Sequence, residues 1–139
     1  MADFTSLARS VKGEVVTPED PGYDAAIARW AKNAERKARV VVFVKNAEDV
    51  VHSIAFAKNN ELPIAVRGGG HNAGGASSAE GGLVIDLSRH LNNVRVDAEQ
   101  QLGYVGGGAL WRDVDAEAIK YGLATVGGTI NHVCIFSSI

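Results

Sequence analysis

Residues 40–66 read VVVFVKNAEDVVHSIAFAKNNELPIAV and combine three hydropathy patterns. The uninterrupted apolar run at 40–44 is typical of a strand that is covered on both faces. Two acidic residues then open a segment with helical character, and a helix dipole favours acidic side chains at its start, so we predict a helix over residues 47–59. A second apolar run follows at 62–66. Strand, helix and strand in this order predict a βαβ unit with parallel strands.

Periodicity predicts further elements on both sides of this unit. Apolar residues recur at helical spacing from Tyr23 to Ala34, which predicts a helix over 23–37 and places Trp30 in its packed face. The face of the 47–59 helix expected to be buried comprises Val50, Val51, Ile54, Ala55 and Ala57 or Lys58. The other expected elements are strands at 83–87, 94–97, 102–105 and 123–126, the middle two antiparallel, and a helix over 109–121 capped by Gly122.

Composition excludes several classes of protein. The 139 residues carry 14 basic and 16 acidic side chains, a net charge of −2, which argues against a partner of nucleic acid or anionic membrane. The single cysteine, Cys134, excludes an internal disulfide and a cysteine-based zinc site, and the histidines lack metal-site spacing, so we expect no metal. No stretch resembles a signal peptide or membrane span, which predicts a cytoplasmic protein.

Glycine is over-represented, and the sixteen glycines cluster. Residues 67–78 read RGGGHNAGGASS and follow a predicted parallel strand, the edge where α/β sheets bind ligands. Backbone N–H groups of such a turn can form an anion site. The Walker A pattern needs a Gly-Lys pair, which is missing, and Ala73 occupies the third glycine of the dinucleotide fingerprint. The loop therefore predicts a phosphate or pyrophosphate site of another kind, the alternative being a mobile surface connection.

Motifs along nearly the whole chain occur in the same order in one known family. They are the lead-in 13–24, the tryptophan at 30, RGGGHN at 67–72 with Gly75-x-Ser77, GLVIDLS at 82–88, Val105-x-Gly107-Gly108-x-x-Trp111, and YGLATVGG at 121–128. The chain resembles the N-terminal portion of FAD-linked oxidases of the vanillyl-alcohol oxidase family. Within that family it is most similar to the berberine-bridge-enzyme-like and 6-hydroxy-D-nicotine-oxidase-like branch.

The resemblance implies an α+β, PCMH-type FAD-binding fold. Residues 1–35 would form a helical lead-in and residues 36–139 the FAD-binding domain. That domain would contain an N-terminal βαβ subdomain and the start of a second, mainly antiparallel subdomain, truncated at its C-terminal end.

The resemblance also assigns roles to two glycine-rich turns. In the family, the histidine after the glycines is bonded to the 8α carbon of FAD, which implies covalent FAD at His71. The other implied FAD contacts are Arg67, Gly68, Gly69, Gly70, Asn72, Gly75 and Ser77, with Gly127, Gly128 and Thr129 covering the other side of the flavin. Some relatives carry a second link through a cysteine. The matching position here is Ile130, so we expect a single link and an ordinary thiol at Cys134.

After His132 and Val133 the family continues with Gly-x-Gly-Gly, whereas this chain reads CIFSSI over 134–139. The resemblance therefore implies that the substrate domain and the catalytic base lie beyond residue 139. The implied function is a flavin-dependent oxidoreductase that takes hydride from an alcohol, sugar, amine or alkaloid-type substrate and is reoxidised by O2. The alternatives are a non-catalytic remnant that binds FAD or a nucleotide phosphate, and a sensor of free mononucleotides. The sequence leaves the substrate and the oligomeric state open.

Overall fold

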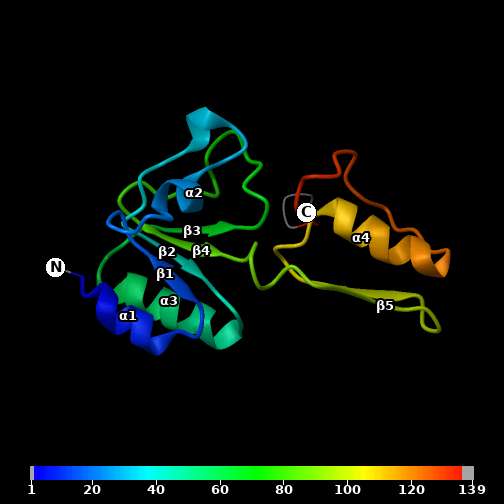
Figure 1. Cartoon of the computed structure of the whole chain (residues 1–139), viewed down its shortest axis with the longest axis horizontal. Helices are drawn as coiled ribbons and strands as arrows, with labels where there is room; N and C mark the ends of the chain where they lie inside the picture. The colour runs from blue at the N-terminus through cyan, green and yellow to red at the C-terminus, as the bar shows by residue number, and fades with distance from the viewer. Residues whose placement is uncertain (1, 136–139) are drawn as a thin grey trace.

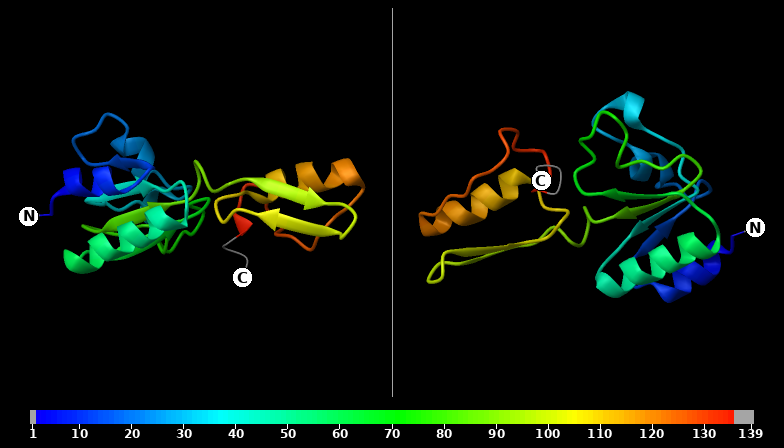
Figure 2. Two further views of the ribbon diagram at one scale, coloured as in Figure 1. Left: turned by 90° about the horizontal axis from the view of Figure 1, so that it is seen from below. Right: turned by 180° about the vertical axis from the view of Figure 1, so that it is seen from behind.

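The computed structural model describes residues 2–135, which form two lobes (Figure 1). The first lobe holds a four-stranded sheet in the order β1-β2-β4-β3, and the second pairs the β5-β6 hairpin with helix α4. Both views in Figure 2 place the second lobe beyond the carboxyl ends of the parallel strands. The elements are α1 (Phe4–Ser10), β1 (Glu14–Val16), α2 (Tyr23–Ile27), the 3-10 helix η1 (Lys32–Ala34), β2 (Val40–Phe43), α3 (Ala47–Asn59), β3 (Ile64–Arg67), β4 (Leu83–Asp86), β5 (Val94–Asp97), β6 (Leu102–Val105), α4 (Trp111–Ala118) and the 3-10 helix η2 (Ile119–Tyr121).

The middle of the first sheet is buried on both faces, as the apolar runs predict. β4 lies between β2 and β3 and is parallel to both, and every residue of β2 and β4 is buried. On one face Leu7 of α1 and Ala57 of α3 pack against Val42. On the other face Ala26 of α2 packs against Val41. Each layer removes apolar surface from water, which fixes the position of the strand ends that carry the glycine-rich loop.

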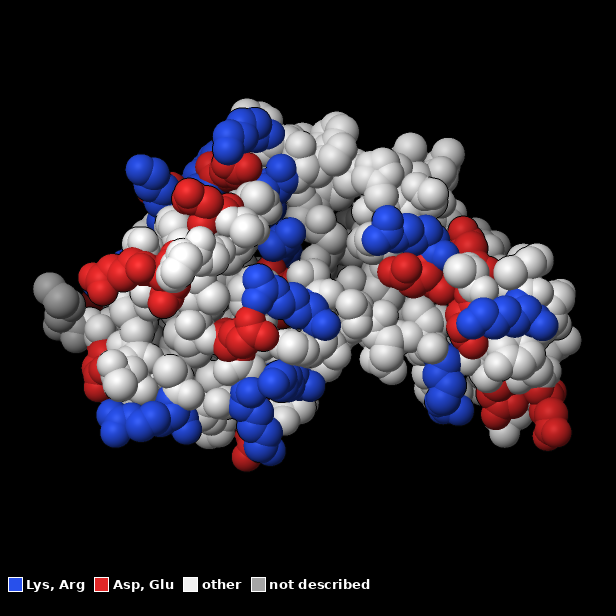
Figure 3. All heavy atoms as spheres, in the orientation of Figure 1, with Lys and Arg blue, Asp and Glu red and all other residues white. Residues whose placement is uncertain are grey.

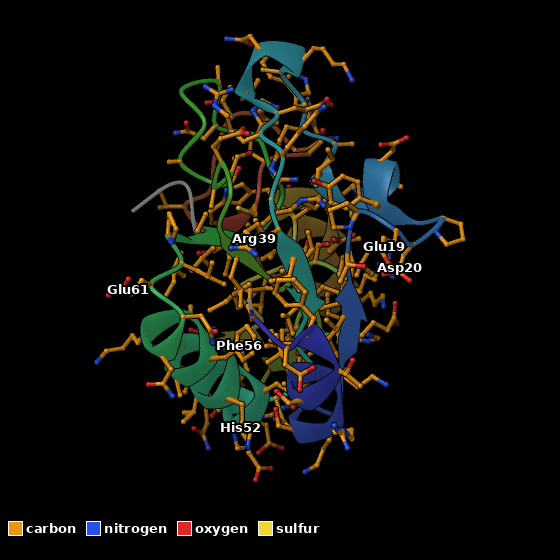
Figure 4. The ribbon with its side chains drawn as sticks, turned by 90° about the vertical axis from the view of Figure 1, so that its left-hand side faces the viewer. Glu19, Asp20, Arg39, His52, Phe56 and Glu61 are labelled. Atoms are coloured by element: carbon orange, nitrogen blue, oxygen red, sulfur yellow. The ribbon has the colours of Figure 1, made fainter. Side chains whose placement is uncertain are left out.

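Helix α3 has the predicted bounds, but the face predicted to be buried is wrong in part. Val51 is 63% exposed and Ile54 is 38% exposed. The buried residues of α3 are Asp49, Ser53 and Ala57. Phe56, labelled in Figure 4, lies beside this face. Its ring contacts that of Phe4 in α1, with centroids 5.9 Å apart. Hydropathy misplaced the face because two of the three buried side chains are polar and satisfied by hydrogen bonds.

Asp49 ties the start of β1 to the end of β2. Its carboxylate accepts hydrogen bonds from the backbone N–H groups of Lys12, Gly13 and Lys45 at 2.8, 3.0 and 2.8 Å. Burial raises the pKa of this carboxyl, but the three N–H bonds outweigh that effect and hold the pKa below its ordinary value of 3.8. The charged form is therefore favoured by the fold.

We expect Asp49→Ala to lower the free energy of unfolding by about 3 kcal/mol, because three backbone donors lose a charged acceptor. The contribution is present above the ordinary pKa of 3.8 and is lost as the pH falls through the lower, folded-state pKa. Urea titrations at several pH values should show the gap between wild type and variant closing in acid. Asp97→Ala, which removes a single bond at an exposed turn, is the control. Equal losses in the two variants would contradict the prediction.

The predicted helix over 23–37 is wrong beyond Ile27. α2 ends there, the chain becomes extended at Ala28, and Trp30 is 63% exposed instead of packed in the core. The backbone N–H of Trp30 donates to the carbonyl oxygen of Gly70 at 3.2 Å. This segment therefore follows the glycine-rich loop instead of continuing as a helix, since a tertiary hydrogen bond takes the place of a helical one.

The elements observed in the second lobe agree with the predicted ones except at its end. β5 and β6 are antiparallel, as predicted. The helix predicted over 109–121 is divided into α4 and η2, and Gly122 ends it in the left-handed region with φ of 66°. The strand predicted over 123–126 is wrong: this segment pairs with no strand among residues 2–135. The expected departure from the family pattern falls partly on residues 136–139, outside the described residues.

No helix among residues 2–135 is long and apolar enough to cross a lipid bilayer.

Candidate functional site

The glycine-rich loop, residues 67–78, leaves the carboxyl end of β3 and lies at the junction of the two lobes (Figure 1). Its first glycine contacts the second lobe. A Cβ at Gly68 would stand 2.7 Å from Sγ of Cys134 and 2.9 Å from the carbonyl oxygen of Gly107. Cys134 itself is buried at 4% exposure. Glycine is therefore required at 68 so that the lobes can pack together, whatever the loop binds.

Two later glycines turn the loop through conformations that side chains avoid. Gly70 has φ of +70° and Gly75 has φ of +87°. Between them, Oδ1 of Asn72 accepts a hydrogen bond from the N–H of Ala76 at 3.2 Å, which closes the turn. Turns of this kind can direct N–H groups into one concavity, but those of Gly75, Ala76 and Ser78 are bonded within the loop, so the anion site stays a prediction.

Four polar side-chain atoms of the loop are buried without a hydrogen-bond partner. They are Nε of Arg67, Nε2 of His71, Oγ of Ser77 and Oγ of Ser78, and none of them bonds to a described residue. Buried polar groups in native proteins nearly always have partners, so these atoms indicate a ligand or ordered water. A phosphate-bearing cofactor with a ring system near the histidine fits this donor set, and the residues present therefore fit FAD.

Arg67 is bonded to the first lobe through Nη1, while its Nε lies next to Gly70 without a partner. Its Nη1 donates to Oδ2 of Asp86 at 2.9 Å, and Asp86 is fully buried. The other oxygen of Asp86 accepts from the N–H and hydroxyl of Ser88 at 2.8 and 2.6 Å. This ion pair joins the ends of β3 and β4, so Arg67 holds the start of the loop in place.

Sequence reasoning missed Arg29, whose guanidinium is buried under the loop. Nε and Nη2 donate to the carbonyl oxygen of Ser77 at 3.1 and 2.7 Å, and the residue is 8% exposed. Burial first, and then the charge of Arg67, lower the pKa of Arg29 to about 10, while Asp86 and Glu35 oppose them. It stays cationic at neutral pH. The only sequence signal is an arginine beside a motif tryptophan, which periodicity assigned to a helix.

His71 lies between two aromatic side chains. The Trp30 ring stacks on it with centroids 4.4 Å apart and planes at 16°. The His132 ring approaches it at 4.7 Å with planes at 54°. Trp30 comes from the segment after α2 and His132 from the end of the chain, so three distant parts of the sequence meet at this imidazole.

The second predicted turn, residues 127–129, lies in the second lobe. Gly127, Gly128 and Thr129 line a hollow of about 700 Å³ between the β5-β6 hairpin and α4. A Cβ at Gly127 would stand 2.9 Å from the ring of Trp111. Two residues near this end contact the 67–78 loop: His132 meets His71, and Cys134 lies against Gly68. On the face shown in Figure 3, charged side chains of both signs are spread over both lobes, and the junction is mainly uncharged.

A family model for the FAD binding domain matches residues 38–139. The chain belongs to this FAD-binding family. The match begins just before β2 and includes the glycine-rich loop, His132 and the second lobe. It confirms the predicted α+β, PCMH-type FAD-binding fold and the family resemblance.

Curated relatives of this FAD-binding chain are oxidoreductases. It is 38% identical over 128 residues to (R)-6-hydroxynicotine oxidase of Paenarthrobacter nicotinovorans, covering 92% of this chain and 28% of that protein. It is 35% identical over 136 residues to an FAD-linked oxidoreductase of Aspergillus terreus, covering 96% and 27%. The chain thus spans little more than a quarter of the length of these relatives.

Solved structures agree on the fold. The crystal structure of 6-hydroxy-D-nicotine oxidase from Arthrobacter nicotinovorans superposes with a TM-score of 0.87 at 36% identity, over 91% of this chain and 28% of that one. A berberine-bridge-enzyme-like protein of Physcomitrella patens gives a TM-score of 0.85 at 20% identity, over 96% and 29%. The second likeness supports the fold alone.

Proposed function

We propose that this chain is the FAD-binding part of an oxidoreductase that takes hydride from an alcohol, sugar, amine or alkaloid-type substrate and is reoxidised by O2. The observation that carries the proposal is the set of buried, unpartnered polar atoms on the 67–78 loop of an FAD-binding fold. The relatives' names support oxidoreductase chemistry, and one of them names a hydroxynicotine as what it oxidises.

Within this proposal the loop binds the pyrophosphate. Gly68, Gly69, Gly70, Asn72 and Gly75 supply backbone N–H groups or the turns that aim them, and Ser77 supplies a hydroxyl donor. Arg67 acts from below through its ion pair with Asp86. Gly127, Gly128 and Thr129 are proposed to cover the other side of the flavin on the strength of the family resemblance, since the hollow that they line is formed by residues of the second lobe.

His71 is the proposed point of covalent attachment. Its Nε2 is buried and unpartnered, which leaves a lone pair or a proton available to a ligand at the lobe junction. FAD, when bound, supplies the acceptor of the substrate's hydride. The chain's own contribution is to bind the phosphates, to orient the ring system beside His71 and to exclude water from the loop floor through the contact of Gly68 with Cys134.

We place the catalytic base and the substrate pocket beyond residue 139. The 139-residue chain, supplied with FAD, should therefore bind it weakly and release no substrate-dependent peroxide, because a productive site holds the reacting groups about 3–3.5 Å apart on a rigid frame. A peroxide assay across alcohols, sugars and amines checks this. The positive control is a chimera in which residues 1–139 replace the matching portion of (R)-6-hydroxynicotine oxidase. Peroxide from the isolated chain above the free-flavin background would contradict the expectation.

The second candidate is a non-catalytic module that holds FAD or another nucleotide phosphate. It is supported by the same buried, unpartnered loop atoms, which fit a bound phosphate whether or not a reaction follows. The chimera separates the two candidates: binding of FAD without turnover in it would favour the module, and turnover would favour the oxidoreductase.

A further inference from the structure

The segment Arg29-Trp30 contacts the glycine-rich loop at three points. The backbone N–H of Trp30 donates to the carbonyl oxygen of Gly70, where the loop first turns. The Trp30 ring stacks on His71. The Arg29 guanidinium donates two hydrogen bonds to the carbonyl oxygen of Ser77, at the far end of the loop. Two adjacent residues thus contact the beginning, the histidine and the end of one loop.

These contacts are unusual for the positions that the two residues occupy. Trp30 is 63% exposed, so its ring contributes little to the core, yet its plane lies within 16° of the imidazole plane. Arg29, by contrast, is a cation held at 8% exposure near a second cation, Arg67, which is paired with the buried Asp86. Burying a charge is costly unless its hydrogen bonds are made. Here two are made to the Ser77 carbonyl of the loop, and Nη1 donates to the carbonyl oxygens of Ala26 and Ala28 at the end of α2.

We propose that Arg29 and Trp30 are positioning residues for the cofactor site: Arg29 sets the conformation of the loop and Trp30 sets the plane of the His71 imidazole. The proposal rests on the proposed function, in which this loop and this histidine hold FAD. Arg29 also places a positive charge beneath the concavity, which favours an anionic ligand there.

The two residues act differently. The Trp30 stack restricts rotation of His71 about its side-chain torsions and so fixes the direction of the buried Nε2. The fork of Arg29 holds the Ser77 carbonyl and so fixes where the Ser77 hydroxyl lies. Because Trp30 is exposed, its removal tests positioning with little effect on the fold.

The test uses the 139-residue chain in three forms: wild type, Trp30→Ala and Trp30→Phe. In wild type the His71 side chain should occupy a single χ1 rotamer, read from its three-bond couplings in NMR spectra. Trp30→Ala should average these couplings over several rotamers with the melting temperature nearly unchanged, and Trp30→Phe should restore most of the single-rotamer values. His71 couplings that are the same in wild type and Trp30→Ala would overturn the role of Trp30.

For Arg29 the readout is FAD affinity, measured by quenching of flavin fluorescence. Arg29→Met should weaken binding about ten-fold or more, and Arg29→Lys, which keeps the charge but not the fork, should weaken it less. Arg95→Met is the matched control, since Arg95 lies over the ring of Tyr104 in the second lobe, and its affinity should equal that of wild type. Equal FAD affinity in Arg29→Met and wild type would overturn the role of Arg29.

The outcomes separate this inference from the function that it rests on. A wild-type chain that binds no FAD, while the His71 rotamer depends on Trp30 as expected, would refute the proposed cofactor site and leave the positioning of His71 standing. FAD binding in wild type together with unchanged variants would refute the positioning roles alone. If Arg29→Met does not fold, Arg29→Lys carries the comparison, and an affinity equal to wild type in that folded variant overturns the role of the fork.

Discussion

Replacing His71 by alanine is expected to release all FAD on denaturation, whereas the unaltered protein should retain it. The expectation rests on the proposed attachment at His71, whose Nε2 is buried and unpartnered beside a stacked tryptophan. The measurement is made on the chimera with (R)-6-hydroxynicotine oxidase. After precipitation with acid, the flavin is measured in pellet and supernatant. The retained fraction should fall from nearly complete to background.

Two matched variants make the result specific. Cys134→Ser removes the only thiol of the chain, and His52→Ala removes an imidazole from α3, away from the loop. Both should keep FAD in the pellet. Flavin on a Cys134 peptide, found by mass spectrometry, would contradict the assignment, and so would flavin retained in the His71→Ala protein.

Gly75→Val is expected to weaken FAD binding by about 30-fold, equal to about 2 kcal/mol. Gly75 has φ of +87°, where a β-branched residue is strongly disfavoured, so the turn must reopen and redirect the N–H groups that it aims. A Cβ there would stand 3.6 Å from the nearest atom, an ordinary contact. The loss therefore comes from the backbone and not from a clash. Titration of the chain with FAD measures it.

Gly81→Val is the control for backbone strain. Gly81 also has a positive φ, +61°, with no atom within 4 Å of a Cβ, but it lies after the loop, next to β4. The two variants should lose similar stability, about 1–3 kcal/mol, and only Gly75→Val should lose FAD affinity. Parallel losses of affinity would show that general destabilisation, and not the loop, is responsible.

The sequence predicted the fold well wherever a local pattern coincides with burial. The apolar runs of β2 and β4 are buried on both faces, and the bounds of α3 are as predicted. The failures have tertiary causes. The face of α3 was misplaced because Asp49 turns inward to bind three backbone donors. The helix predicted beyond Ile27 does not form, since the backbone N–H of Trp30 donates to the carbonyl oxygen of Gly70 in the loop.

The candidate site, too, was predicted in part and missed in part. Glycine clustering after a strand indicated the loop, and positive φ at Gly70 and Gly75 agrees with that interpretation. The role of His71 came from family resemblance and stays a prediction. Arg29 could not have been found, because nothing in its neighbours along the chain indicates that it reaches Ser77. Its partner is fixed by packing between segments that are far apart in sequence.

The contact between Gly68 and Cys134 has a consequence for the order of folding. The loop is made early during synthesis, but the residue that seals its floor belongs to the last part of the described chain. During translation β2, α3, β3 and β4 can assemble first, leaving the loop tethered at both ends yet open beneath. Closure must await the second lobe. Cofactor capture would accordingly be a late event, and a ribosome-bound chain halted before Cys134 should have a folded sheet without a finished binding loop.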